Sequence, residues 1–279
     1  MKNLTRNSTP LRRSTTPLRI ILSTLIAASA PLIFAENTEE KWTNLFNGKD
    51  LNGWHAHLGK FGDESSQKLS EIFTVKDGTI HIYDGAKPDS KQASANLYHE
   101  SEWSHFHLQV EYRWLEPKFQ PRTKANRDAG ILFHVHSQPE KVWPPSLEMQ
   151  LGDGKPGDKY VTGDLFVLGT TRADSPSKEN KYQPDAPMVT RGRGAAPART
   201  MATEYAEKPL GEWNLAEVIV HGSKKAEFIL NGKTLNVIHN FKYLDADRNW
   251  KPLEKGHISI QAEWAELQYR TIRVKKIKE

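Results

Sequence analysis

Apolar and polar residues alternate along most of the chain from Trp42 onward, in short runs that turn residues separate. The clearest run covers residues 105–115, HFHLQVEYRWL, where almost every second residue is apolar. A period of two places successive side chains on opposite faces of a β-strand. No window of helical length carries a sustained period of 3.6 residues, so the pattern predicts an all-β chain.

Two dipeptides predict tight turns between such runs. Asp77-Gly78 separates residues 72–75 from 79–83, and Asn231-Gly232 follows residues 226–230. Both dipeptides tolerate the left-handed backbone of a two-residue hairpin. Further strands are expected at residues 129–137, 146–151, 161–168, 215–221, 234–238, 256–262 and 267–276. Ten or more strands without intervening helices predict a sandwich or a barrel.

Residues 1–35 differ from the rest of the chain. They hold five basic residues and no acidic one, and an apolar run fills residues 20–35. This order predicts a secretory signal peptide, with an uncleaved N-terminal anchor as the alternative. Both place the remaining chain outside the cytoplasm, in the periplasm or secreted. We expect one domain over residues 42–277, in which residues 171–212, rich in Pro, Gly, Arg and Lys, form a long polar loop.

The formal charge of +5 comes from this N-terminal segment. Without its five basic residues, the 39 Lys and Arg fall to 34, which balance the 34 Asp and Glu. A neutral mature chain gives no electrostatic reason to expect nucleic acid as a partner. No run reaches the ~18 apolar residues of a membrane-spanning helix, so we expect no membrane partner for the mature form. The absence of Cys excludes a disulfide framework and a thiol nucleophile.

Three predicted strands carry polar side chains behind an apolar face. If these strands lie on one curved sheet, the polar side chains line a common groove, with Trp54, Trp143 and Trp264 at its rim. The groove residues would be His134, His136, Glu148, Gln150, Gln261 and Glu263. Half-exposed antiparallel strands show the same alternation, so an ordinary solvated face is the alternative.

Other motifs leave several kinds of site open. His134 and His136 lie two residues apart on one strand face and could hold a divalent metal ion. Asp153, Asp158 and Asp164 could bind calcium, although they fit turns equally well. The basic pair Arg191 and Arg193 is expected in a solvated loop or as an anion clamp. No Gly-x-Ser-x-Gly or Gly-rich phosphate motif supports a serine hydrolase or a nucleotide enzyme.

An ordered series of motifs resembles the domain of unknown function 1080, a family described as 3-keto-glucoside 1,2-lyase / 3-keto-2-hydroxy-glucal hydratase or 3-keto-disaccharide hydrolase. The motifs are WTNLFNGKDLNGW at 42–54, DAGILFHVH at 128–136, WPPSLEMQLGD at 143–153 and GHISIQAEWAELQYRTIRV at 256–274. The resemblance covers roughly residues 42–277. It implies a concanavalin A-like lectin/glucanase β-sandwich (jelly roll) with a sugar-binding concave face.

The resemblance also implies an oligosaccharide or glycoside substrate that carries a ketone at C3. Such a ketone acidifies the C2 proton, so a base can remove it, the C1 aglycone leaves, and water can add to the product. The expected groups are His136 or Glu148 as the base, His134, Arg191 or Arg193 as the charge stabiliser, and Glu263 as the acid, with a divalent ion as an alternative stabiliser. The expected substrate-binding residues are Asp128, Trp143, Gln150, Gln261, Arg191 and Arg193.

Two other functions remain open at this point. A conventional glycoside hydrolase would use Glu148 and Glu263 as paired carboxylates on an unoxidised glycoside. A non-catalytic carbohydrate-binding module would keep the Trp and Gln residues and need no acid–base pair, because a fold does not dictate its function.

Overall fold

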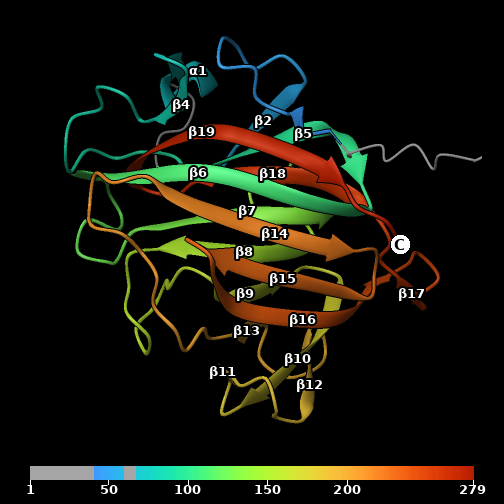
Figure 1. Ribbon diagram of the computed structural model, residues 1–279. Coiled ribbons are helices and arrows are strands. Elements are labelled where there is room, and N and C mark those ends of the chain that lie inside the picture. Colours follow the sequence, from blue (N-terminus) through green and yellow to red (C-terminus); the bar gives the residue numbers. More distant parts are fainter. Residues whose placement is uncertain (1–40, 60–66) are drawn as a thin grey trace, which may run out of the picture. The chain divides into compact units, whose positions relative to one another are not determined.

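The computed structural model describes residues 41–59 and 67–279, whose regular structure is almost entirely β-strand (Figure 1). The helix α1 (Leu69–Ile72) is a single turn. The predicted signal peptide or anchor at residues 1–35 lies outside the described residues. Within the part of the chain that is described, no helix has the length and apolar character needed to cross a bilayer.

The larger sheet has twelve strands. They are β1 (Thr43–Asn44), β3 (Phe73–Lys76), β4 (Thr79–Ile82), β6 (His105–Lys118), β10 (Thr171–Lys178), β11 (Lys181–Tyr182), β12 (Met188–Gly192), β14 (Asn214–His221), β15 (Lys225–Leu230), β16 (Lys233–Leu244), β17 (Trp250–Pro252) and β19 (Ala265–Lys276). Their main order is β11-β10-β16-β15-β14-β6-β19-β4-β3, with β1 beside β19, β12 beside β10 and β17 beside β16.

The smaller sheet has seven strands. They are β2 (Trp54–Leu58), β5 (Ala95–Trp103), β7 (Asp128–Val135), β8 (Ser146–Gly152), β9 (Leu165–Leu168), β13 (Arg199–Thr200) and β18 (Gly256–Ala262). Their order is β13-β9-β8-β7-β18-β5-β2, and each neighbouring pair is antiparallel.

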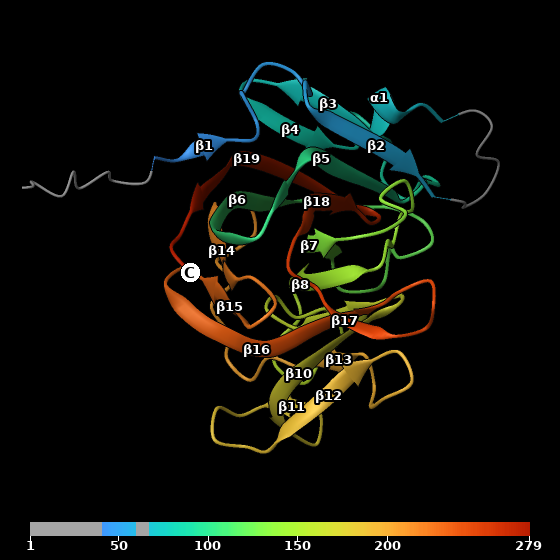
Figure 2. The same cartoon turned by 90° about the vertical axis from the view of Figure 1, so that its right-hand side faces the viewer.

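The two sheets form two layers around one apolar core (Figure 2). Alternate residues of each strand point inward, such as Leu108 and Val110 on β6 and Ile131 and Leu147 on the opposite sheet, and all four are fully buried. Burying one such side chain stabilises the fold by ~1.5–3 kcal/mol. The fold is therefore an all-β sandwich, as the strand pattern predicts, and of the concanavalin-like class that the family resemblance implies.

Both predicted hairpin turns are confirmed. Asp77-Gly78 joins β3 to β4 with φ values of 50° and 73°, and Asn231-Gly232 joins β15 to β16 with φ values of 50° and 82°.

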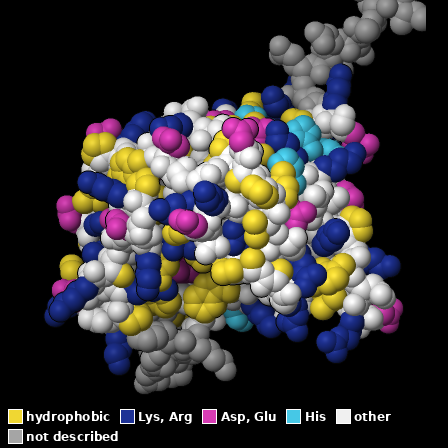
Figure 3. All heavy atoms as spheres, turned by 90° about the horizontal axis from the view of Figure 1, so that it is seen from below, with side chains coloured by type: hydrophobic (Ala, Val, Ile, Leu, Met, Phe, Trp, Pro, Cys, Tyr) yellow, Lys and Arg dark blue, Asp and Glu magenta, His cyan; other side chains and the backbone are white. Residues whose placement is uncertain are grey.

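On the face of the molecule that Figure 3 shows, basic and acidic side chains are interspersed with apolar ones.

The prediction of a polar loop over residues 171–212 is wrong for residues 171–200. Strand β10 pairs with β16 and with β12, which extends the larger sheet, and β13 pairs with β9. The β10–β12 ribbon projects at the lower end of the sandwich in Figure 1. Polar residues occupy both buried positions of the ribbon, such as Ser175 and Arg191, and open ones, such as Arg172 and Thr190. The ribbon therefore lacks the apolar alternation that identifies a strand in sequence.

Strand β7 carries a bulge at its C-terminal end. On the neighbouring β18, Ser259 pairs with Leu132 but His257 pairs with Val135, so one extra β7 residue is inserted between them. The backbone of His134 has a φ of 49°. A Cβ at Gly256 would lie 2.6 Å from the carbonyl carbon of His134, so only glycine leaves room for this approach.

Candidate active site

The register of the smaller sheet brings four predicted site residues onto one face. Glu148 pairs with Leu132, and Gln150 pairs with Gly130. Gln261 follows Ile260, which pairs with Ile131, so Gln261 lies beside Gly130. The intervening apolar residues point into the core, so these polar side chains point to the outer face. Glu263 continues this face, because it bridges to Asp128 just beyond the end of β18.

Glu148 and Gln261 converge above Gly130. A Cβ at Gly130 would lie 2.3 Å from Glu148 Oε1 and 2.3 Å from Gln261 Oε1, so these two oxygens are close neighbours. Glu148 is 5% exposed and Gln261 is fully buried. Among the described residues, none donates a hydrogen bond to the Glu148 carboxyl or pairs with the Gln261 amide. Buried polar groups without partners are unusual in a native protein and are available to a ligand.

The surroundings of Glu148 favour its protonated form. Burial raises its pKa well above the usual range, and the negative charges of Glu263 and Asp164 raise it further. No positive group among the described residues forms an ion pair with Glu148 to oppose this effect. A carboxyl that keeps its proton near neutral pH can act as an acid.

Glu263 is buried as well, but it has partners that favour its charge. Trp143 Nε1 donates a hydrogen bond of 2.6 Å to Glu263 Oε1, and Arg122 Nη1 lies 3.7 Å from Oε2. Burial raises the Glu263 pKa, whereas Trp143 and Arg122 oppose that rise. Of the two carboxyls, Glu263 is therefore the better placed to be ionised.

Arg122 is the site residue that sequence reasoning missed. It pairs with Asp128, and its guanidinium lies 4.6 Å from the ring centre of Tyr160 and 4.8 Å from that of Trp264. Two rings and two carboxylates thus fix this cation beside Glu263. Arg122 lies in the connection between β6 and β7, where no periodic pattern marks a side chain's direction.

Asp128 and Gln150, both expected to bind substrate, bind each other. Gln150 Nε2 lies 2.6 Å from Asp128 Oδ1, and it also donates to the carbonyls of Ala129 and Leu151 at 2.5 and 2.8 Å. Both side chains are buried. Asp128 therefore orients Arg122, and the Gln150 amide nitrogen is already committed within the protein.

The connection between β7 and β8 covers part of this face. Asn96 Nδ2 donates hydrogen bonds of 3.1 Å to the carbonyls of Pro139 and Lys141 in that connection. Trp143 at its far end is 48% exposed, which fits the predicted rim, while its indole nitrogen reaches Glu263. Trp264 is buried but borders the site, because its ring centre lies 6.5 Å from that of Trp143 and 4.8 Å from the Arg122 guanidinium. Trp54, the third predicted rim residue, belongs to the core cluster.

The predictions for the two histidines are wrong. His134 is fully buried, with ring centres of Phe106, Phe133 and Phe241 within 5.7–6.0 Å, because the β7 bulge turns it inward. His136 lies past the strand end, where Nε2 is 3.0 Å from Thr171 Oγ1 of the larger sheet. Burial lowers the pKa of each to about 4. Neither histidine faces Glu148, so neither is placed as its base partner or as the charge stabiliser.

The predicted metal sites find no support in the side-chain positions. The two imidazoles have different neighbours, since three Phe rings surround His134 and His136 lies beside Thr171. No group of three His, Asp or Glu side chains in residues 41–59 and 67–279 could hold a metal ion. Asp153 instead pairs with Arg127 at 2.6 Å, and Asp158 accepts a hydrogen bond from the Lys155 backbone at 3.0 Å.

Arg191 and Arg193 do not form an anion clamp at this site, contrary to the prediction. Arg191 is buried inside the β10–β12 ribbon, where it donates to Asn180 Oδ1 at 2.5 Å and Ser177 Oγ at 2.6 Å. Arg193 is exposed just past the end of β12. Both residues belong to the ribbon that extends the larger sheet, and Arg122 supplies the cation beside Glu263 in their place.

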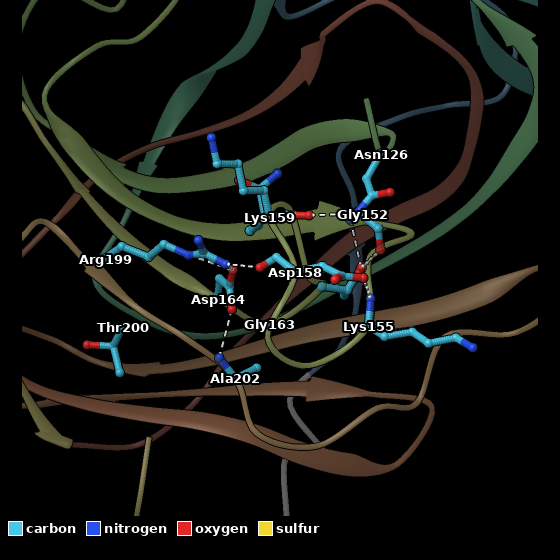
Figure 4. A network of polar contacts seen from close by, with 12 residues as sticks. Asn126, Gly152, Lys155, Asp158, Lys159, Gly163, Asp164, Arg199, Thr200 and Ala202 are labelled. Carbon is cyan, nitrogen blue, oxygen red and sulfur yellow. Dashed lines mark hydrogen bonds and ion pairs between the residues drawn. The ribbon is translucent and has the colours of Figure 1, made fainter. Parts of the chain in front are cut away.

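Asp164 anchors the connection between β8 and β9, as Figure 4 shows. Its carboxylate accepts hydrogen bonds from Arg199 Nε at 2.9 Å and from the Ala202 backbone at 2.7 Å. Arg199 Nη2 also donates to the Asp158 carbonyl at 2.9 Å. This network ties β13 to the connection that follows the Glu148 strand.

Comparisons with known proteins identify relatives of the chain. A family model described as a 3-keto-alpha-glucoside-1,2-lyase-like domain matches residues 41–275. A search of curated proteins found no match.

A search of solved structures finds proteins of low sequence identity. A protein of Parabacteroides distasonis ATCC 8503, provisionally described as a glycosyl hydrolase, is 19% identical, with 85% of this chain and 94% of that chain covered and a TM-score of 0.49. The carbohydrate binding module CBM66 from Bacillus subtilis is 10% identical, with coverages of 80% and 96% and a TM-score of 0.41. SCLam, a non-specific endo-beta-1,3(4)-glucanase of family GH16, is 9% identical, with coverages of 85% and 92% and a TM-score of 0.45.

Proposed function

The chain belongs to the 3-keto-alpha-glucoside-1,2-lyase-like family, and from this premise we propose that it cleaves 3-keto-glycosides by elimination at C2 and C1. The family marks it as a carbohydrate-active β-sandwich protein. The proposed substrate is a glycoside or oligosaccharide whose ring already carries a ketone at C3. One observation supports this chemistry above the others: two buried carboxyls share one face, and only one of them has a cation beside it.

This asymmetry supports a division of roles opposite to the one expected from sequence. Glu263, which faces Arg122 and Trp143, is the base that accepts the C2 proton. Glu148, whose pKa burial raises well above the usual range, is the acid that protonates the leaving oxygen. Two carboxyls whose environments separate their pKa values are a common solution for paired acid and base roles.

The bonds change as follows in the proposed reaction. The C2–H bond breaks, the proton moves to the Glu263 carboxylate, and the electron pair is delocalised onto the C3 oxygen as an enolate. When the enolate collapses, the C1=C2 double bond forms, the C1–O bond breaks, and the leaving oxygen takes the Glu148 proton. Addition of water across C1=C2 then gives the free 3-keto sugar, so elimination and hydration sum to hydrolysis.

Arg122 is the proposed stabiliser of negative charge. Its guanidinium is fixed by the rings of Tyr160 and Trp264 before substrate arrives, so it needs little reorganisation when the enolate forms. Gln261 is proposed to bind a sugar hydroxyl, because its buried amide has no partner among the described residues. Trp143 is proposed to contact the sugar with its exposed indole surface.

The test compares a 3-keto-disaccharide with its unoxidised parent, in H2O and in D2O. We expect cleavage of the oxidised sugar alone, with one deuterium at C2 of the product from D2O, because elimination removes that hydrogen. Cleavage of the parent sugar would instead support a conventional glycosidase. Binding of either sugar without cleavage would support a non-catalytic module.

We also propose that the protein is exported to the periplasm or secreted, on the basis of the N-terminal sequence. Mass spectrometry of the protein from its native cell compartment checks this. A mature chain that begins near residue 36 agrees with a cleaved signal peptide, and a full-length chain in the membrane fraction agrees with an anchor.

A further inference from the structure

A cavity of about 370 Å³ opens on the outer face of the larger sheet, on the opposite layer of the sandwich from Glu148. It lies over β3, β4, β19 and β6 and next to the start of β14. Its walls include the side chains of Lys76, His81, Arg113, Trp213, Gln268 and Arg270. Its volume falls within the ~300–1,000 Å³ range of small-molecule sites and exceeds what a bare inorganic anion fills.

A row of hydrogen-bonded side chains forms the floor of this cavity. His81, Gln268 and Arg113 are direct partners on β4, β19 and β6. Arg113 Nε donates to Gln268 Oε1 at 2.7 Å, and Gln268 Nε2 lies 3.2 Å from His81 Nδ1. His81 Nε2 is in turn 2.6 Å from Glu266 Oε1. The row fixes the Arg113 guanidinium through Nε and leaves its two terminal nitrogens without a partner among the described residues.

The Trp213 ring contacts the guanidinium groups of both Arg113 and Arg270. Its ring centre lies 4.7 Å from the Arg113 guanidinium and 4.0 Å from that of Arg270. The Arg270 charge is already paired with Glu111 at 2.8 Å, whereas Arg113 has no carboxylate partner among the described residues. Lys76 and Asp77 lie at the rim, where Lys76 Nζ is 3.3 Å from Asp84 Oδ2 and Asp84 Oδ1 is 3.2 Å from His81 Nδ1. Arg113 is therefore the cation of the lining that has no carboxylate partner among the described residues.

We propose that this cavity is a second binding site, which takes a sugar unit that bears a carboxylate, such as a uronic acid. The free edge of a fixed guanidinium matches a carboxylate with two parallel hydrogen bonds. Thr79 and Lys76 offer polar groups for ring hydroxyls, and the indole offers apolar contact for ring CH groups. The site is separate from Glu148, so it does not depend on the proposed elimination chemistry.

The test is a calorimetric titration of the full chain with D-glucuronate, D-glucose, acetate and inorganic phosphate. We expect glucuronate to saturate one site and to bind at least about tenfold more tightly than the other three, because only glucuronate has both the carboxylate and the ring. Arg113→Gln should weaken glucuronate binding by at least about tenfold, and Arg113→Lys should weaken it less. Cleavage of a small 3-keto-disaccharide should be unchanged in Arg113→Gln.

Arg273→Gln is the matched control. Arg273 Nε donates to Gln109 at 2.9 Å and its guanidinium lies 4.6 Å from the Trp42 ring centre, so it repeats the Arg113 environment outside this cavity. Glucuronate binding should survive both Arg273→Gln and Glu148→Gln. The proposal is overturned if phosphate or acetate binds as tightly as glucuronate, if no ligand saturates, if Arg273→Gln weakens binding as much as Arg113→Gln, or if Glu148→Gln abolishes it.

Discussion

At the scale of single residues, the pKa of a buried carboxyl depends on whether a partner stabilises its negative charge. Glu148 lost its contact with water when the sheet formed and gained no cation, so its pKa lies well above the usual range. Glu263 shares that burial, but Arg122 and Trp143 support its charge. The same residue type is thus held in two environments on one face, of which only that of Glu263 supports a negative charge.

Glu148→Gln should lower turnover of a 3-keto-glycoside by about 100- to 10,000-fold, the usual range for loss of a general acid. The fold should be unaffected, because the amide has the same shape and the buried carboxyl has no partner to lose. Steady-state kinetics and thermal melting measure the two effects. Unchanged turnover in a folded variant removes Glu148 from the reaction.

Glu207 allows a second test of buried carboxyls, away from the site. It accepts hydrogen bonds from Tyr112 at 2.6 Å and Thr162 at 2.8 Å, and burial raises its pKa from 4.5 to about 7. Because the folded state holds this proton more tightly than the unfolded chain, the stabilisation is fully present below about pH 4.5 and is lost as the pH rises through about 7.

Glu207→Gln should therefore reduce the loss of stability between pH 5 and pH 8 by about 2–3 kcal/mol relative to the unmodified protein. Urea denaturation at the two pH values measures the free energy of unfolding of each protein. Equal pH dependence in both proteins would show that Glu207 does not bind its proton more tightly in the folded state.

At the scale of elements, the sequence predicts features that depend on neighbouring residues, such as hairpin turns, and misses those that depend on distant strands. Asn231 and Gly232 specify their hairpin alone, because the turn type needs their left-handed backbone and little else. The direction of His134 depends on a bulge that Gly256 permits from a distant strand, so alternation along β7 could not reveal it. Arg122 lies in a connection without period, where only the folded chain shows the partners.

The β7–β8 connection supplies the Trp143 hydrogen bond to Glu263, and Trp143→Phe removes that donor while keeping a ring. The Glu263 pKa should then rise, so the acidic limb of kcat/KM against pH should move to higher pH by about one unit. A pH–rate profile measures the shift, with Trp42→Phe as a control. A limb that stays in place would show that Glu263 is not the ionising base.

At the scale of the whole molecule, both sheets contribute to one core. The strand register that places apolar residues in this core also places the site residues on the outer face of the smaller sheet. The sandwich class and the shared face of Glu148, Gln150 and Gln261 follow from the apolar alternation that builds that core. The β10–β12 ribbon could not be predicted from apolar alternation. Its strands contribute few side chains to the core, so its sequence carries little apolar pattern.

Arg199→Ala should lower the free energy of unfolding by about 3 kcal/mol, because it leaves the fully buried Asp164 carboxylate without its cation. Urea denaturation followed by both fluorescence and circular dichroism should give one coincident transition, since the layers share a core. The double variant with Asp164→Asn should recover part of the loss. Two separate transitions, or a loss below about 1 kcal/mol, would contradict this account.

The two layers turn their outer faces in opposite directions, with Glu148 on one and Arg113 on the other. A polysaccharide chain held at the Arg113 face would leave the Glu148 face turned toward free solution. The protein would then work as a catalyst immobilised on a matrix, and the diffusion of small oxidised sugars, rather than that of the protein, would set how often the two meet.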